Sequence, residues 1–137
     1  MAQIRELMTV KPRTVKAGDS VVEAAKLMKG EDAGIAPIVD GDRLVGVVTD
    51  RDIAIRVVAE GRDPESTTVD DIASQNVVTV DPEQDLDEAL RLMAQHQLRR
   101  LPVVEEDGRL VGIVAQADVA RRVDAARTGE VVGEISE

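Results

Sequence analysis

The 137-residue chain contains no cysteine, tryptophan, tyrosine or phenylalanine, and 27 acidic residues outnumber 17 basic ones to give a formal net charge of −10. The lack of cysteine excludes disulfides, thiolate metal sites and a cysteine nucleophile. The acidic balance disfavours nucleic acid and anionic membranes as partners, and no apolar stretch approaches the roughly 20 residues that span a bilayer. We therefore expect a cytoplasmic globular protein with a purely aliphatic core.

An internal repeat organises the chain. Residues 14–40 align with residues 79–105 at an offset of 65, and eight of these 27 positions are identical. After a one-residue insertion, residues 43–57 align with residues 109–123, and nine of these 15 positions are identical. The chain therefore consists of two copies of one structural unit.

The first copy opens with a short strand at residues 14–15. Apolar residues then recur at the spacing of an amphipathic helix, at Val21, Ala24, Ala25 and Met28. Ser20 and Glu23 have the spacing of a capping box at the start of this helix. Two strands follow at residues 35–39 and 44–48, joined by the turn sequence Asp40-Gly41-Asp42. A second helix is predicted from near Thr49 to Gly61, ahead of Pro64.

The second copy repeats this order, with a strand at 79–80, a helix with apolar residues from Leu86 to Met93, strands at 101–104 and 110–114, and a helix from near Ala115. The fold class is thus α+β, with two β-α-β-β-α units. We assign residues 1–62 to the first repeat, with a short N-terminal helix, and residues 63–68 to a linker. Residues 69–125 form the second repeat, which opens with a helical turn at 69–73.

Residues 126–137 form a polar tail that we expect to be poorly ordered or helical. Each half has only about 60 residues, too few for a comfortable core of its own, so the halves should pack on each other. We expect the two sheets to share one core.

The strand-to-helix runs Gly46–Ile53 and Gly112–Val119 resemble the motifs of CBS (cystathionine β-synthase) domains. Pro37 and Pro102, each inside an apolar strand after a helix, fit the same pattern. The resemblance covers nearly the whole chain and is closest to the stand-alone bacterial type. It implies a pseudo-twofold pair of repeats, known as a Bateman-type module, that forms a homodimer.

The resemblance also implies a ligand that contains adenosine, bound in a cleft between the repeats. AMP, ADP, ATP, S-adenosylmethionine and NAD are the candidates, and no covalent cofactor is expected. Such modules regulate a protein partner in trans, which the sequence does not identify. The alternative function is a dimeric interaction module without a ligand.

Within this pattern, Asp52 and Asp118 would bind the ribose, because a carboxylate accepts hydrogen bonds from both hydroxyls of a vicinal diol. Thr49 would face the phosphate near a helix N-terminus. Thr49 and Asp52 also have capping-box spacing, which offers a purely structural interpretation. The second copy favours the ribose interpretation, because Ala115 cannot cap and Asp118 is nevertheless present.

Arg99 and Arg100 are the candidate phosphate ligands, and the resemblance places them across the cleft against the ligand held by Asp52. The cleft with Asp118 would then face the uncharged Gly34 and Ile35, so we predict one competent site and one weak or empty site. The alternative is that both arginines form weak surface ion pairs. The adenine would contact residues with aliphatic or small side chains, namely Val10, Thr14, Ile35, Ala36 and Pro37.

Other chemistry-bearing residues give no catalytic or metal site. The acidic run at 81–88 is explained by a helix start with proline followed by carboxylates, and it lacks the spacing of an EF-hand. His96 is the sole histidine and lies at a predicted helix end. Because no nucleophile with a base and no glycine-rich phosphate loop is present, we predict that the chain is not an enzyme.

Overall fold

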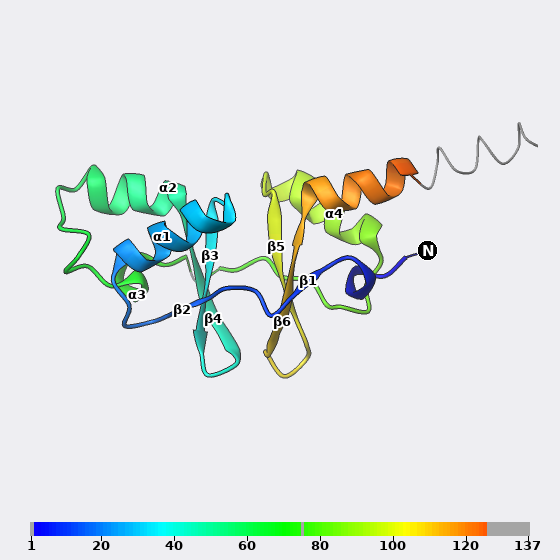
Figure 1. The fold of residues 1–137 in the computed structure, drawn as a ribbon, viewed down its shortest axis with the longest axis horizontal. Helices are drawn as coiled ribbons and strands as arrows, with labels where there is room; N and C mark the ends of the chain where they lie inside the picture. The colour runs from blue at the N-terminus through cyan, green and yellow to red at the C-terminus, as the bar shows by residue number, and fades with distance from the viewer. Residues whose placement is uncertain (1, 75, 126–137) are drawn as a thin grey trace, which may run out of the picture.

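The computed structural model describes residues 2–74 and 76–125, which form two similar halves that lie side by side (Figure 1). The sheet of the first half contains β2 (Val15–Lys16), β3 (Ile35–Asp40) and β4 (Arg43–Thr49), in the order β2-β3-β4. Strand β2 is parallel to β3, whereas β3 and β4 form an antiparallel hairpin. With helix α1 (Val21–Glu31) after β2 and helix α2 (Asp50–Ile53) after β4, the predicted β-α-β-β-α order is confirmed.

The second half repeats this arrangement with one difference in its sheet. Helix α4 (Leu86–His96) precedes the antiparallel hairpin of β5 (Arg100–Val104) and β6 (Leu110–Ala115), and residues 116–125 are helical. The strand predicted at 79–80 is reduced to a single parallel bridge between Val80 and Val103. The third strand of this sheet is instead β1 (Thr9–Val10), which pairs antiparallel with β6.

Local signals for the helix ends are partly confirmed. Ser20 occupies the N-cap of α1, but its side chain makes no cap hydrogen bond, so the predicted capping box is wrong. The Glu23 amide donates to the Ser20 backbone carbonyl instead, at 3.0 Å. Helix α2 continues into the π-helical segment η2 (Ala54–Val58), and the chain turns at Gly61 with a φ of 68°. The helix therefore ends at Val58, three residues before the predicted end, and Gly61 lies in the turn that follows it.

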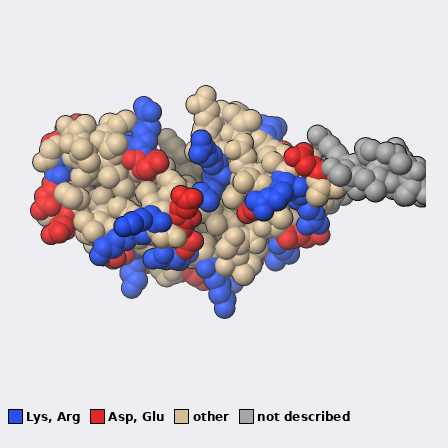
Figure 2. All heavy atoms as spheres, turned by 45° about the horizontal axis from the view of Figure 1, so that its top comes forward, with Lys and Arg blue, Asp and Glu red and all other residues tan. Residues whose placement is uncertain are grey.

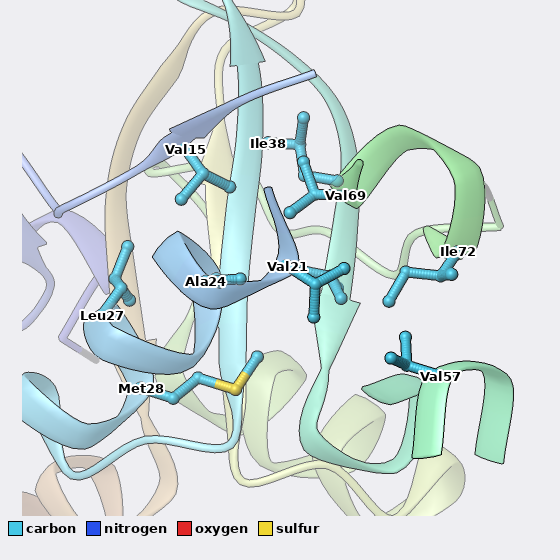
Figure 3. Close-up of a cluster of buried hydrophobic side chains, with 11 residues drawn as sticks. Val15, Val21, Ala24, Leu27, Met28, Ile38, Val57, Val69 and Ile72 are labelled. Carbon is cyan, nitrogen blue, oxygen red and sulfur yellow. The ribbon is translucent and has the colours of Figure 1, made fainter. Parts of the chain in front are cut away.

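The segment that leads into each copy packs on the opposite half. The 3-10 helix η1 (Ile4–Glu6) places Ile4, which is fully buried, in the core of the second half. The predicted helical turn after the linker is α3 (Val69–Ile72), and both Val69 and Ile72 are buried in the core of the first half (Figure 3). In Figure 1 the N-terminal segment accordingly crosses from the second half to the first.

The halves pack on each other, as predicted, but each has its own core. One buried cluster gathers residues of α1, β2, β3, β4 and α3, and a separate one gathers residues of η1, α4, β5, β6 and the final helix. The expectation of one shared core is wrong, because each sheet buries one face against the helices of its own half. At the hairpin turns the halves join through backbone bonds: the Leu44 N–H donates to Gly108 O, and the Leu110 N–H to Asp42 O.

Helices α1, α2 and α4 lie along one side of the molecule, and the two hairpin turns lie along the other (Figure 1). No helix within the described residues has the length and apolar character needed to cross a membrane.

Candidate functional site

A cavity of about 180 Å³ lies where the two halves meet, and we call it the inter-repeat cavity. The first half contributes Leu27, Glu31, Ala33, Ile35 and Pro37 to its lining. The second half contributes Arg100, Ile113, Ala115 and Asp118. The N-terminal connection between the halves supplies Thr9, Lys11, Pro12 and Arg13.

The crossing of the N-terminal segment explains why Lys11 and Arg13 reach this cavity. Strand β1 pairs with β6 in the second half, and β2 pairs with β3 in the first half. Residues 11–14 connect these two strands and must therefore span the junction between the sheets. The backbone of Lys11 is left-handed, with a φ of 51°, a conformation that costs energy for a residue with a side chain and that is often found at functional sites.

The charge of the inter-repeat cavity is opposite in sign to that of the whole chain. Three cationic residues line it, Lys11, Arg13 and Arg100, together with the two carboxylates Glu31 and Asp118. Three positive and two negative charges leave a formal charge of +1, in a chain whose total is −10. The charged residues that line the cavity therefore favour an anionic ligand. Figure 2 shows a recess between the two halves, with Lys or Arg side chains on both sides of it.

Asp118 is accessible from this cavity. It lies in the first turn of the helix at 116–125, and its side chain is 43% exposed. Its one hydrogen-bond partner within residues 2–74 and 76–125 is Arg121, whose Nη2 lies 3.3 Å from Oδ1. A carboxylate with this exposure keeps lone pairs for further donors.

Asp52, at the matching position of the first copy, is used by the fold. It is only 8% exposed. The Thr49 N–H donates to Asp52 Oδ2 at 2.9 Å, and the Asp52 N–H donates to Thr49 Oγ1 at 3.1 Å, which completes a capping box for α2. The Ser74 hydroxyl donates to the same carboxylate at 3.3 Å. The structural interpretation of Thr49 and Asp52 is therefore realised, and neither residue lines the inter-repeat cavity.

The predicted pairing of cations with carboxylates is reversed in the structure. Arg100 lines the inter-repeat cavity together with Asp118, whereas the family resemblance predicts it beside Asp52. Ile35 and Pro37, which the sequence predicts as adenine contacts, line the same cavity. The expectation that the Asp118 cleft lacks positive charge is wrong, because the crossing segment carries Lys11 and Arg13 into it.

The remaining predicted contacts lie outside the cavity lining. Arg99 is exposed, and its backbone carbonyl accepts the Gln116 N–H at 2.7 Å. Thr14 is exposed, Ala36 is fully buried in the first core, and Val10 is 61% exposed. None of these side chains contributes to the lining.

Lys11, Arg13 and Glu31 were missed by sequence reasoning. The run Lys11-Pro12-Arg13 places two cations between Val10 and Thr14, both of which the sequence predicts as ligand contacts. A cluster of positive charge in an acidic chain was the available signal. Glu31 carried no such signal, because a carboxylate near a helix end is ordinary.

The acidic run at 81–88 is part of a helix start, as expected. The Glu83 N–H donates to Asp81 Oδ1 at 2.8 Å, and the Asp81 N–H donates to Gln84 Oε1 at 2.8 Å.

A second cavity, of about 510 Å³, lies near the hairpin turns. Its lining includes the acidic residues Asp81, Glu105 and Glu106 and no Lys or Arg, so its charge disfavours a phosphate.

Comparison with known proteins identifies the repeated unit. The family model of the CBS domain matches residues 4–59 and 69–125. The CBS domain-containing protein YhcV of Bacillus subtilis is 44% identical over 120 residues, which cover 88% of this chain and 84% of that protein. Hypoxic response protein 1 of Mycobacterium tuberculosis is 40% identical over 124 residues, which cover 90% of this chain and 86% of that protein.

Solved structures show the same fold. The crystal structure of Hypoxic Response Protein I with two coordinated zinc ions matches with a TM-score of 0.79 and 40% identity over 88% of this chain and 98% of that one. CBSX2 in complex with AMP matches with a TM-score of 0.79 and 27% identity, over 93% of this chain and 99% of that one. Two matched copies thus cover almost all of the chain, which belongs to the CBS-domain family as a tandem pair of repeats.

Proposed function

We propose that this chain is a non-catalytic regulatory module that binds an adenosine-containing ligand in the inter-repeat cavity. The observation that carries the proposal is the meeting of Asp118 with Lys11, Arg13 and Arg100 in one cavity between the halves. AMP, ADP, ATP, S-adenosylmethionine and NAD all contain the adenosine group that this arrangement suits.

The cavity offers a partner for each part of such a ligand. The Asp118 carboxylate accepts hydrogen bonds from both ribose hydroxyls. The aliphatic side chains of Leu27, Ile35 and Ile113 supply apolar contacts for the adenine, because this chain has no aromatic residue to stack on it. Where the ligand carries a phosphate, as AMP, ADP, ATP and NAD do, the three cations attract it. At about 180 Å³ the cavity is smaller than the 300–1,000 Å³ typical of whole ligand sites, so we expect the phosphates to project over its rim.

Structural neighbours support this class of ligand. CBSX2 was crystallised with AMP. The CBS domain pair of protein MJ0100, with a TM-score of 0.76 and 28% identity, was crystallised with 5′-methylthioadenosine and S-adenosyl-L-methionine. We infer that the cavity of this chain serves the same class of compound.

Regulation follows from the position of the cavity between two separate cores. A ligand held by residues of both halves stabilises the relative packing of the halves that it binds best. We propose that a partner protein recognises this packing in trans.

Because the chain contains no phenylalanine, tyrosine or tryptophan, a nucleotide that copurifies with the protein shows its ultraviolet band without interference.

The decisive experiment compares Asp118→Ala with Asp52→Ala in calorimetric titrations with AMP and adenosine. We expect Asp118→Ala to remove measurable binding of both compounds, because both use the ribose. We expect Asp52→Ala to leave both affinities within about twofold, because its carboxylate is used by the capping box. Loss of binding in Asp52→Ala alone would overturn the assignment of the cavity.

We also propose that the module is a homodimer. Ile55 and Val58 are 46% and 72% exposed and lie one turn apart on η2, where they give an apolar surface for a second copy. Light scattering of the purified chain measures its mass in solution. A dimer that binds none of the adenosine compounds would favour the alternative function, a ligand-free interaction module.

A further inference from the structure

Arg13 lies over a glycine near the end of α1. Gly30 is in the last turn of this helix, where alanine would favour the helical conformation more than glycine does. A Cβ at Gly30 would come within 2.7 Å of Arg13 Nη1. The guanidinium of Arg13 therefore occupies the space that any larger residue at this position would need.

The next residue of α1 contacts the same guanidinium. Arg13 Nε lies 3.7 Å from Glu31 Oε1, and the two side chains are 57% and 47% exposed. An ion pair with this exposure contributes little to stability. Its main consequence is that Glu31 places a negative charge next to Arg13 beside the inter-repeat cavity.

The fold itself does not require this arrangement. Helix α4 matches α1 residue for residue at an offset of 65, and its counterpart of Gly30 is Gln95. The counterparts of Arg13 and Glu31 are Val78 and His96. A helix of the same length in the same place thus forms with a long side chain at the glycine position, so the helix does not require glycine at Gly30, and the open space there is taken by the Arg13 guanidinium.

We propose that Arg13, seated over Gly30 and paired with Glu31, is a residue by which the inter-repeat cavity selects phosphorylated adenosine compounds over uncharged ones. This inference rests on the proposed function and names the charge class of its ligand. Arg13 supplies the discriminating charge, Gly30 gives its guanidinium a place beside the cavity, and the Glu31 carboxylate limits the preference by repelling the phosphate.

The test is the ratio of the affinities for AMP and adenosine, measured by calorimetric titration of the full chain. Arg13→Gln should lower the affinity for AMP by about fivefold and leave that for adenosine within about twofold. Glu31→Gln should raise the affinity for AMP by about threefold, because the repulsion removed exceeds the loss of a weak exposed pair. Higher salt should reduce both effects.

Gly30→Ala separates this role from a general effect on folding. The added methyl group displaces the Arg13 side chain while it favours the helix, so the preference for AMP should fall with no loss of thermal stability. Lys16→Gln is the matched control: it removes one positive charge from the same segment, at an exposed residue outside the cavity lining, and should leave the ratio unchanged.

The outcomes distinguish the two proposals. Equal loss of AMP and adenosine binding in Arg13→Gln, or a change no larger than in Lys16→Gln, would overturn the selective role of Arg13 while the binding function stands. A wild-type chain that binds neither compound would overturn the proposed function, and this inference with it.

Discussion

Asp52 and Asp118 occupy matching positions in the two repeats, yet their surroundings give them different roles. Asp52 is almost fully buried and accepts hydrogen bonds from the Thr49 backbone and the Ser74 hydroxyl. Asp118 follows Ala115, which has no hydroxyl, and its only partner among the described residues is the exposed Arg121. The difference between Thr49 and Ala115, together with the Ser74 contact in the first half, therefore separates a carboxylate that caps a helix from one that is available to a ligand.

The stability of two matched variants tests this difference. Asp52→Ala should lower the free energy of unfolding by about 1–2 kcal/mol, because it removes a cap and leaves buried donors without a partner. Asp118→Ala should change it by less than about 0.5 kcal/mol, because it removes a weak surface pair. Urea denaturation measures both values, and equal losses would contradict the difference in role.

Among the secondary-structure elements, the short strand β1 has the largest consequence for the site. It is an edge strand of the second sheet, and the cavity residues Lys11 and Arg13 follow it closely in the sequence. Its close approach to β6 depends on Gly112, where a Cβ would lie 2.9 Å from the Thr9 carbonyl oxygen and 2.7 Å from Met8 Sδ. The matching residue of β4, Gly46, has the equivalent carbonyl of Ser74 at 3.4 Å, an ordinary contact.

We therefore expect different results from the two matched glycine variants. Gly112→Ala should cost about 1–3 kcal/mol of stability, because the backbone of β1 has to move. It should also weaken AMP binding, since the displaced strand carries Lys11 and Arg13 with it. Gly46→Ala should cost less than about 0.5 kcal/mol. Thermal unfolding and calorimetric titration measure the two effects, and similar results for both variants would refute the importance of β1.

In the whole molecule, the two cores are separate, but each contains residues from the segment that leads into the other repeat. Ile4 belongs to the second core, whereas Val69 and Ile72 belong to the first. The crossing at 11–14 therefore connects residues that pack in different halves, whereas the linker at 63–68 joins Val57 and Val69, which belong to the same core. The boundaries 1–62 and 69–125 remain a description of the repeat in the sequence, and neither range contains a complete core.

Because each core contains residues from the segment that leads into the other repeat, we predict that the chain unfolds as one cooperative unit. Ile4→Ala should lower the free energy of unfolding by about 2–4 kcal/mol, and Val69→Ala should act in the same direction. Both variants should shift one common transition, with equal calorimetric and van't Hoff enthalpies. Two resolved transitions in scanning calorimetry, of which each variant shifts only one, would show that the halves unfold independently.

The sequence by itself determined the repeat, the order of helices and strands and the CBS family, because these depend on local periodicity and on motifs that recur at a fixed offset. Two of the cavity residues, Ile35 and Pro37, were also predicted as adenine contacts. Only the tertiary structure decided that Arg100 lies with Asp118, that Asp52 caps α2, and that Lys11 and Arg13 reach the cavity. The physical reason is that the repeat alignment shows which residues of the two copies correspond. The site depends instead on the path of the segments that cross between the copies. That path is set by burial of Ile4, Val69 and Ile72 in the opposite cores.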